Sequence, residues 1–503
     1  MHTETENARV SFVQMGINGL DNILGGGLAA NRLYLVEGDP GTGKTTLGLQ
    51  FLLEGVRNGE PAVYVSLSET KDELETVARS HGWSLDGLTV TELAPSEESL
   101  ASEAENTMFH PAEIELGETT KTVLSDVERV KPRRVVFDSL SEMRLLAQNS
   151  LRYRRQILAL KQYFVGRNCT VMLLDDRTSD VTDLQLQSLA HGVVSLERRS
   201  PEYGVMQRRL QIVKMRGKPF RPGYHDYTIV KGGLDVFPRL VAAEHHDDFA
   251  PEQVKSGLPG LDALVCGGLD RGTSTLLMGP AGSGKSTLAT QYAVNAARGG
   301  QRAAFFLFDE GRTTLLARSA ALGLDLREHL KSGRVGIRQV DPGAISAGEF
   351  IHLVRQEVDN EGAKIIVIDS LNGYLNAMPE ARFLAIQLHE LLVYLGQRGV
   401  TTLLVVAQHG LVGPMQTPVD ASYLADSVIL LRFFEAEGRV RQAISVLKKR
   451  SGPHERTIRE LEFRAGGIHI GEPLATFHGI LTGVPSQSGN SPRGKKGSAD
   501  ESE

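Results

Sequence analysis

The sequence predicts an α/β protein made of two tandem domains, each a mainly parallel sheet flanked by helices. One observation is a repeat, in which the paired residues, always 241 residues apart, are Gly16 and Gly257, Gly26 and Gly267, and Lys44 and Lys285. An interval of that length is too long for a solenoid, so it indicates a duplicated domain. In both halves, apolar runs of strand length alternate with helix-forming segments. A glycine-rich loop also follows the first of these strands in each half.

Both glycine-rich loops match the pattern G-x-x-x-x-G-K-[ST], in which successive backbone N–H groups bind phosphate at a helix N-terminus. An apolar run leads into each loop (33–36 and 275–278), and a helix-forming segment leads out (46–56 and 287–297). We therefore expect two ATP sites, in which each lysine holds the β- and γ-phosphates. The expected ATP-binding residues are Gly38, Asp39, Gly41, Thr42, Gly43, Lys44, Thr45 and Thr46, and Gly279, Ala281, Gly282, Ser283, Gly284, Lys285, Ser286 and Thr287.

The remaining elements follow in the same order in both halves. In the first half we expect strands over 62–67, 135–138, 170–174, 193–197 and 210–214, and helices over 70–81 and 152–165. In the second half we expect strands over 304–308, 365–369, 401–407, 428–431 and 443–448, and a helix over 381–397. Ligands bind such sheets at the C-terminal ends of the strands, where both loops lie.

The expected organisation is an N-terminal tail (1–12), a domain (13–240), a polar linker (241–253), a second domain (254–482) and a disordered tail (483–503). The net charge of −6 gives no general attraction to nucleic acid or to anionic membranes. No apolar run approaches the roughly 18 residues that span a membrane, and the N-terminus lacks the pattern of a signal peptide. We therefore expect a cytoplasmic protein, with Cys169 and Cys266 buried.

Two aspartates close apolar runs at positions that suit magnesium binding. Asp138 and Asp369 each end a predicted strand, and each is followed by Ser-Leu. Together with the hydroxyls of Thr45 and Ser286, they are expected to hold Mg²⁺. An aspartate that caps the N-terminus of a helix fits the same position.

Further carboxylates follow the strand that comes after each phosphate loop. Glu69 lies there in the first half, and Asp309 and Glu310 lie there in the second. We expect them to act in catalysis by orienting the attacking nucleophile. A carboxylate placed near a helix N-terminus for electrostatic reasons would also fit.

Basic residues follow a late strand in both halves, namely Lys214 and Arg216, and Lys448 and Arg450. They can be solvated edges of the sheet, the common role of such charges. They can also reach the γ-phosphate held by an adjacent subunit. Their repetition in both halves favours the second interpretation.

Taken together, these features resemble the KaiC family of tandem RecA-like ATPases over about residues 13–480. The resemblance rests on the doubled G-[IL]-x-G-L-D entry, both phosphate loops, both Asp-Ser-Leu strand ends and the segment Lys214-Met215-Arg216-Gly217. It implies a homo-oligomeric double ring of six copies with ATP at the subunit interfaces. It also implies slow hydrolysis in the first ring, autokinase and autophosphatase activity in the second, and signalling partners that the sequence does not identify.

The chain departs from the family pattern at several positions. The paired glutamates of the family correspond here to Ser68-Glu69 and Asp309-Glu310. The adjacent Ser-Thr acceptor pair of the clock protein aligns with Ser422-Tyr423, and Thr417 matches a nearby threonine. Phosphorylation at the single site Ser422 is one interpretation, and a turn residue is the other.

Two other functions compete with this interpretation. A RecA- or DnaB-like DNA-binding motor would use basic loops around a channel, and the acidic net charge and the full duplication argue against it. An ATP-gated scaffold would assemble on nucleotide with little turnover.

Overall fold

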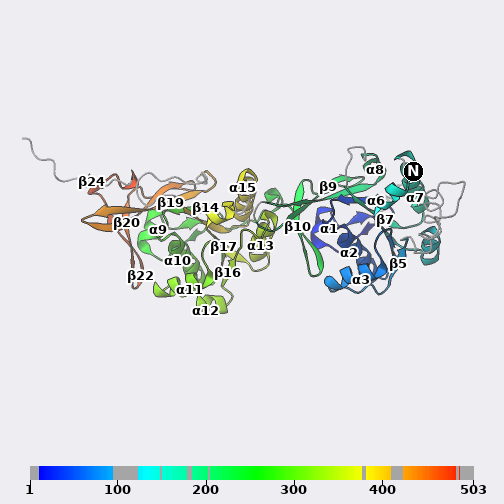
Figure 1. Ribbon diagram of the computed structural model, residues 1–503. Coiled ribbons are helices and arrows are strands. Elements are labelled where there is room, and N and C mark those ends of the chain that lie inside the picture. The colour runs from blue at the N-terminus through cyan, green and yellow to red at the C-terminus, as the bar shows by residue number, and fades with distance from the viewer. Residues whose placement is uncertain are drawn as a thin grey trace, which may run out of the picture. The chain divides into compact units, whose positions relative to one another are not determined.

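A computed structural model describes residues 11–93, 123–147, 150–177, 184–201, 204–376, 381–408, 423–482 and 486–487. The chain divides into two compact units, Met1–Arg239 and Leu240–Glu503. Each unit is built on a nine-stranded sheet with helices packed against it (Figure 1).

The first sheet is parallel from β8 to β5 and is extended by three antiparallel strands. In spatial order its strands are β11 (Gly233–Phe237), β10 (Tyr224–Val230), β9 (Gln207–Met215), β8 (Gly192–Arg199), β3 (Leu33–Gly38), β7 (Thr170–Asp176), β6 (Arg134–Asp138), β4 (Ala62–Ser66) and β5 (Leu88–Glu92). The helices are α1 (Asn18–Ile23), α2 (Lys44–Arg57), α3 (Lys71–Ser80), α6 (Leu140–Ala147), α7 (Ser150–Phe164) and α8 (Leu184–Leu189). The short strands β1 (Phe12–Val13) and β2 (Leu28–Ala29) pair separately.

Alternation along the strands supplies a core to each face of this sheet. Val136 of β6 packs in one core with Leu47 and Phe51 of α2. Its neighbour Val135 belongs to the other core, with Ile157 of α7. The apolar strands are therefore covered on both faces, as expected for a parallel sheet.

The second sheet has the same plan. In spatial order its strands are β16 (Val335–Gln339), β15 (Arg302–Leu307), β17 (Ala363–Asp369), β18 (Thr401–Ala407), β14 (Ser274–Gly279), β19 (Ser427–Ala436), β20 (Arg439–Lys449), β21 (Arg459–Arg464) and β22 (Gly467–Pro473). The helices are α9 (Pro259–Leu264), α10 (Lys285–Arg298), α11 (Arg312–Ala321), α12 (Arg327–Lys331), α13 (Ala347–Asp359), α14 (Leu371–Asn376) and α15 (Ala381–Gln397). Two short strand pairs, β12 (Gln253–Val254) with β13 (Leu269–Asp270) and β23 (Phe477–His478) with β24 (Ser486–Gln487), and the 3₁₀ turns η2 (Ala242–Glu244) and η3 (Ile480–Thr482) complete the unit.

The fold class is confirmed, because both sheets are mainly parallel and flanked by helices. The antiparallel extension of each sheet was not expected. Part of the segment expected to be a linker packs in the second unit, where Ala242 is buried and its N–H donates to Glu390 Oε2 at 3.2 Å. Leu240, expected to end the first domain, is buried in the same core. The tail expected to be disordered from residue 483 contains β24, and its other residues lie outside the described part.

One expected burial is wrong. Cys169 is buried, but Cys266 is exposed, because it lies with φ 53° in the turn that follows α9. Among the described residues, no helix combines the length and apolar character needed to cross a membrane.

Candidate functional site

The first phosphate loop joins β3 to α2 and depends on its glycines. Gly43 adopts φ 91°, a left-handed conformation that favours glycine, immediately before the first turn of α2. A Cβ atom on Gly38 would lie 2.6 Å from the carbonyl oxygen of Leu196, so only glycine fits there. The loop therefore packs tightly and brings backbone N–H groups to the start of α2.

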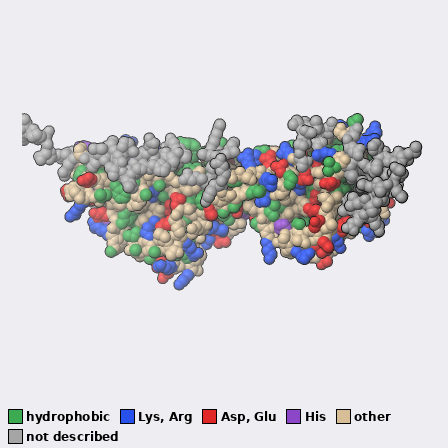
Figure 2. Space-filling model, viewed as in Figure 1, with side chains coloured by type: hydrophobic (Ala, Val, Ile, Leu, Met, Phe, Trp, Pro, Cys, Tyr) green, Lys and Arg blue, Asp and Glu red, His purple; other side chains and the backbone are tan. Residues whose placement is uncertain are grey.

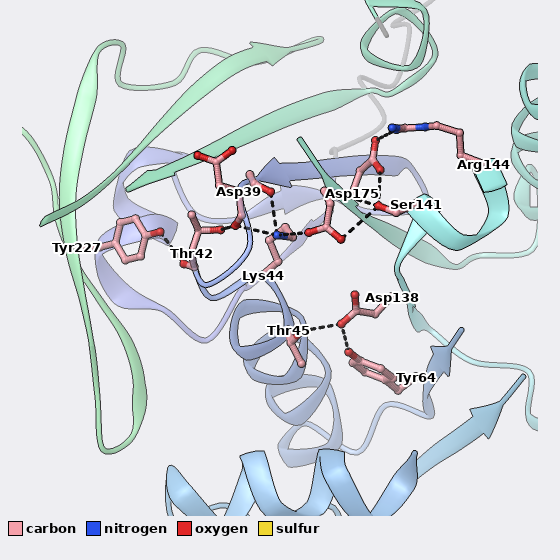
Figure 3. A network of polar contacts seen from close by, with 12 residues as sticks. Asp39, Thr42, Lys44, Thr45, Tyr64, Asp138, Ser141, Arg144, Asp175 and Tyr227 are labelled. Atoms are coloured by element: carbon pink, nitrogen blue, oxygen red, sulfur yellow. Dashed lines mark hydrogen bonds and ion pairs between the residues drawn. The ribbon is translucent and has the colours of Figure 1, made fainter. Parts of the chain in front are cut away.

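Side chains of the loop hold its shape. Thr42 Oγ1 donates to the carbonyl oxygen of Asp39 at 2.8 Å, and the hydroxyl of Tyr227 donates to the carbonyl oxygen of Thr42 at 2.6 Å (Figure 3). Thr46 Oγ1 lies 3.5 Å from His81 Nε2. The antiparallel strand β10, which carries Tyr227, thus helps to position the loop.

Lys44 points back into the loop. Its Nζ donates to the carbonyl oxygens of Gly38 at 2.8 Å and Asp39 at 3.1 Å, and it lies 2.7 Å from Asp176 Oδ1. An ammonium group has three protons, so these three acceptors satisfy it.

Asp138 faces the loop from the end of β6. Its Oδ2 accepts hydrogen bonds from Thr45 Oγ1 at 2.7 Å and from the hydroxyl of Tyr64 at 2.5 Å (Figure 3). Burial raises the pKa of Asp138, and the hydrogen bonds from Tyr64 and Thr45 oppose that shift. Because its carboxylate bonds to Thr45 rather than to the start of α6, the arrangement favours the metal role over that of a helix cap.

Glu69 lies just after β4, and its backbone N–H is held by the side chain of Ser66. Ser66 Oγ accepts from Glu69 N–H at 3.0 Å, and the Oε2 atom of Glu69 is buried without a hydrogen-bond partner among the described residues. Burial raises the pKa of Glu69, and the negative charges of Asp138 and Glu73 add to the shift. Thr70 and Glu73 form the capping box of α3, so Glu69 is not needed as the helix cap.

The second loop has the same geometry between β14 and α10. Gly284 has φ 93°, and a Cβ atom there would lie 2.0 Å from the ring of Phe463. Ser283 N–H donates to the carbonyl oxygen of Pro280 at 3.3 Å, and Gly282 has φ 78°. The other expected ATP-binding residues around this loop are Gly279, Ala281 and Thr287.

The lysine of this loop has a different environment. Lys285 Nζ donates to the carbonyl oxygen of Pro280 at 2.6 Å, and burial lowers the pKa of Lys285 to about 8 against the opposing charge of Asp369. The hydroxyl of Ser286 interacts with Asp369 and opposes the rise in the pKa of that carboxyl group, as the hydroxyl of Thr45 does at Asp138. Burial raises the pKa of Asp369.

The two carboxylates after β15 have separate partners. Glu310 Oε2 forms an ion pair with Arg318 Nη2 of α11 at 3.0 Å. Burial raises the pKa of Glu310, and the positive charge of Arg318 opposes the shift. Asp309 accepts a hydrogen bond from Ser370 Oγ, the residue after Asp369.

The basic residues expected to act between subunits lie far from the loops of their own units. Arg216 N–H donates to the carbonyl oxygen of His191, whose own N–H donates to the carbonyl oxygen of Leu33, at the start of β3. The side chains of Lys214 and Arg216 donate to backbone carbonyl oxygens at the end of α8. The loop follows the other end of β3, about 20 Å away for a strand of this length.

The second unit repeats this separation. Lys448 Nζ donates to the carbonyl oxygen of Ala425 at 2.7 Å, and Arg450 Nη2 donates to that of Tyr423 at 2.9 Å. Asp426 N–H in turn donates to the carbonyl oxygen of Ser274, at the start of β14. The candidate acceptors Ser422 and Thr417 lie outside the described residues.

Comparison with known proteins gives the family. A family model described as "ATPase: KaiC" matches residues 13–241 and again residues 254–475. The chain belongs to the KaiC family. The circadian clock protein KaiC3 of Synechocystis sp. is 26% identical over 503 residues, which cover 97% of this chain and 97% of that protein. The circadian clock oscillator protein KaiC of Synechococcus elongatus is 26% identical over 492 residues, which cover 97% of this chain and 94% of that protein.

Family membership confirms the resemblance found in the sequence. With the two parallel sheets, it shows that the chain is a tandem pair of RecA-like phosphate-loop domains of the KaiC ATPase type. Three residues that contact the expected site residues were not themselves expected from the sequence: Tyr64, Asp176 and Arg318. Only the position of Asp176, at the end of an apolar run, hinted at a place beside the loop.

Proposed function

We propose that this KaiC-family chain binds Mg²⁺ and ATP at both phosphate loops and hydrolyses ATP at the interfaces of a homo-oligomeric ring. The observation that carries the proposal is the repeated arrangement at the two loops. Each loop has a lysine, a hydroxyl that interacts with a buried aspartate, and a glutamate with a raised pKa.

Each residue has a defined task in this proposal. Lys44 and Lys285 bind the β- and γ-phosphates. The pairs Thr45–Asp138 and Ser286–Asp369 offer a hydroxyl and a carboxylate oxygen, the hard oxygen ligands that Mg²⁺ prefers. When bound, Mg²⁺ neutralises charge on the phosphate oxygens.

Glu69 and Glu310 orient the attacking nucleophile and accept its proton. A raised pKa makes each of these carboxylates a better proton acceptor than an ordinary glutamate. The buried and unpartnered Oε2 of Glu69 supports this role, because a buried acceptor without a partner is costly unless a donor arrives. Asp309 would assist in the second site by holding Ser370 beside Asp369.

The positions of the basic residues support the proposed ring. Lys214, Arg216, Lys448 and Arg450 are at the sheet ends opposite to the loops of their own units, so we assign them to the γ-phosphate held by a neighbouring copy. A closed ring gives every site such a neighbour, and we propose six copies. Its size with and without ATP is the direct test, since a chain that stays monomeric with ATP would contradict the interface roles.

ATP turnover tests the catalytic assignment. The double variant Glu69→Gln and Glu310→Gln should reduce turnover by about 100-fold or more, because a general base typically contributes at least that factor. Glu73→Gln is the matched control, because Glu73 lies nearby but serves the capping box of α3. Full turnover by the double variant would show that other groups act as the base.

We further propose serine autokinase activity in the second unit, with Ser422 as acceptor and Thr417 as the alternative. This rests on the aligned acceptor position alone. Phosphosite mapping after incubation with Mg²⁺ and ATP, with Lys285→Ala as control, tests it. Phosphate on either residue that is lost in the control is the expected result, and no phosphate while ATP is consumed would contradict it.

An ATP-gated scaffold that signals to protein partners is the second candidate. It is favoured by the ion pairs that occupy Lys44 and Glu310, since occupied groups slow turnover. Nucleic acid is not among the partners we propose, because acidic and basic side chains are interspersed on the face shown in Figure 2. Binding of single-stranded DNA that weakens steeply with salt would contradict this.

A further inference from the structure

The two phosphate loops face different residues on the neighbouring strand. In the first sheet Gly38, which opens the loop, pairs with Asp176 at the end of β7. In the second sheet Gly279 pairs at the same point with Ala407 at the end of β18. One site therefore has a carboxylate beside its lysine, and the other has a methyl group at that position.

The carboxylate of Asp176 is oriented toward the loop. Ser141 Oγ lies 3.3 Å from Asp176 Oδ2 and accepts from Asp176 N–H at 3.2 Å. The other oxygen, Oδ1, lies 2.7 Å from Lys44 Nζ, whose side chain is only 8% exposed. Because this pair is partly buried, solvent and salt screen its attraction less than that of an exposed pair.

The ion pair with Asp176 occupies an N–H group of Lys44 that a bound phosphate would need. Lys44 gives one proton to Asp176 and two to loop carbonyl oxygens. A nucleotide can contact Lys44 through its phosphates only by displacing one of these acceptors, and Asp176 is the one with the same charge as the phosphate.

We propose that Asp176 is an intramolecular competitor for the nucleotide phosphate, so that the first site binds nucleotide more weakly than it would without this carboxylate. The inference rests on the proposed binding of ATP at this loop. It makes Asp176 a residue that sets affinity at one site of the pair and leaves the other unaffected.

The second site provides the contrast. Lys285 donates to Pro280 O and has no carboxylate at the position of Ala407. The second loop therefore lacks the competing carboxylate that the first loop meets on its neighbouring strand.

Binding of a fluorescent, non-hydrolysable ATP analogue with Mg²⁺ tests the inference in the full chain. Lys285→Ala removes binding at the second loop, so that the titration reports the first. In this background Asp176→Ala should tighten binding about tenfold, the scale of one partly buried ion pair, and Asp176→Asn should tighten it less. The asparagine variant keeps the shape of the side chain if alanine disturbs folding.

Asp175→Asn is the matched control. It removes the same charge one residue earlier, but Asp175 lies 2.6 Å from Arg144 rather than beside Lys44. We expect its affinity to change by less than about twofold. The reciprocal variant Ala407→Asp, in a Lys44→Ala background, should weaken binding at the second loop about tenfold.

The outcomes separate the inference from the proposed function. If the Lys285→Ala protein binds no analogue, ATP binding at the first loop is wrong and the inference falls with it. If it binds, but Asp176→Ala and Asp176→Asn leave the affinity unchanged or weaken it, only the competitor role is wrong. Tighter binding in both, with Asp175→Asn unchanged, is the result that supports it.

Discussion

Arg318 Nη2 lies 3.0 Å from Glu310 Oε2, whereas the residue at the same distance along the chain after Glu69 is Val77. The ion pair therefore involves a different residue in each site, the lysine of the loop in the first and the glutamate in the second. In the first, Lys44 is paired with a carboxylate, and no cation among the described residues forms an ion pair with Glu69. In the second, Glu310 is paired with a cation and Lys285 faces no carboxylate on the neighbouring strand.

Arg318→Val should move the pH profile of the second site. The charge of Arg318 lowers the pKa of Glu310 against the larger effect of burial, so its removal raises that pKa further. Turnover requires the unprotonated base, so the acid limb of the pH profile of turnover should shift to higher pH. A Lys44→Ala background limits the measurement to the second site. Val77→Arg is the matched change at Glu69 and should shift the limb of the first site to lower pH. An unchanged limb in both would exclude these glutamates as the titrating bases.

Tyr64→Phe should lower the apparent affinity of the first loop for Mg²⁺. The Tyr64 hydroxyl donates to Asp138 and lowers the pKa of that aspartate, so without it a proton competes better with Mg²⁺. Loss of one hydrogen bond corresponds to about three- to tenfold in apparent Mg²⁺ affinity. The measurement is the Mg²⁺ dependence of analogue binding in a Lys285→Ala background. Tyr34→Phe, whose hydroxyl bonds to Ala29 O, should leave this dependence unchanged.

His225 should make the first unit sensitive to acid. Its Nδ1 accepts from Arg239 N–H at 2.8 Å, and burial lowers the pKa of His225 from 6.5 to about 4. A lowered folded-state pKa means that stability is present above the unfolded pKa and is lost as pH falls from about 6.5 toward about 4, by about 3 kcal/mol. Urea unfolding followed by the fluorescence of Trp83, the single tryptophan of the chain, reports this. His225→Gln should flatten the dependence over this range, and an equally steep loss in that variant would assign it to other groups.

Gly284→Ala should abolish nucleotide binding at the second loop. The added Cβ would lie 2.0 Å from the ring of Phe463, and φ 93° is strained for any residue with a side chain. Gly299→Ala is the control, because Gly299 has φ −76° and its nearest atom lies at 3.3 Å. Binding by Gly284→Ala equal to that of the control would mean that the loop does not need this conformation.

The parallel core of each sheet could be predicted because its strands are apolar on both faces. Of the added antiparallel strands, β9 and β20 were expected over 210–214 and 443–448, but their antiparallel pairing was not. The strand β10 was missed because it alternates polar with apolar residues and includes charged ones such as Asp226. The phosphate loops were predicted because their residues are contiguous in sequence. Asp176 was missed because strand pairing brings it to the loop from a distant position in the sequence. Arg318 was missed because its contact with Glu310 depends on how α11 packs.

Nucleotide stoichiometry tests the central claim most directly. Calorimetric titration of the full chain with a non-hydrolysable ATP analogue and Mg²⁺ should give two nucleotides per chain, one after Lys44→Ala or Lys285→Ala, and none after both changes. Two nucleotides bound by the double variant, or a parent that binds fewer than two at saturation, would contradict the assignment of an ATP site to each loop.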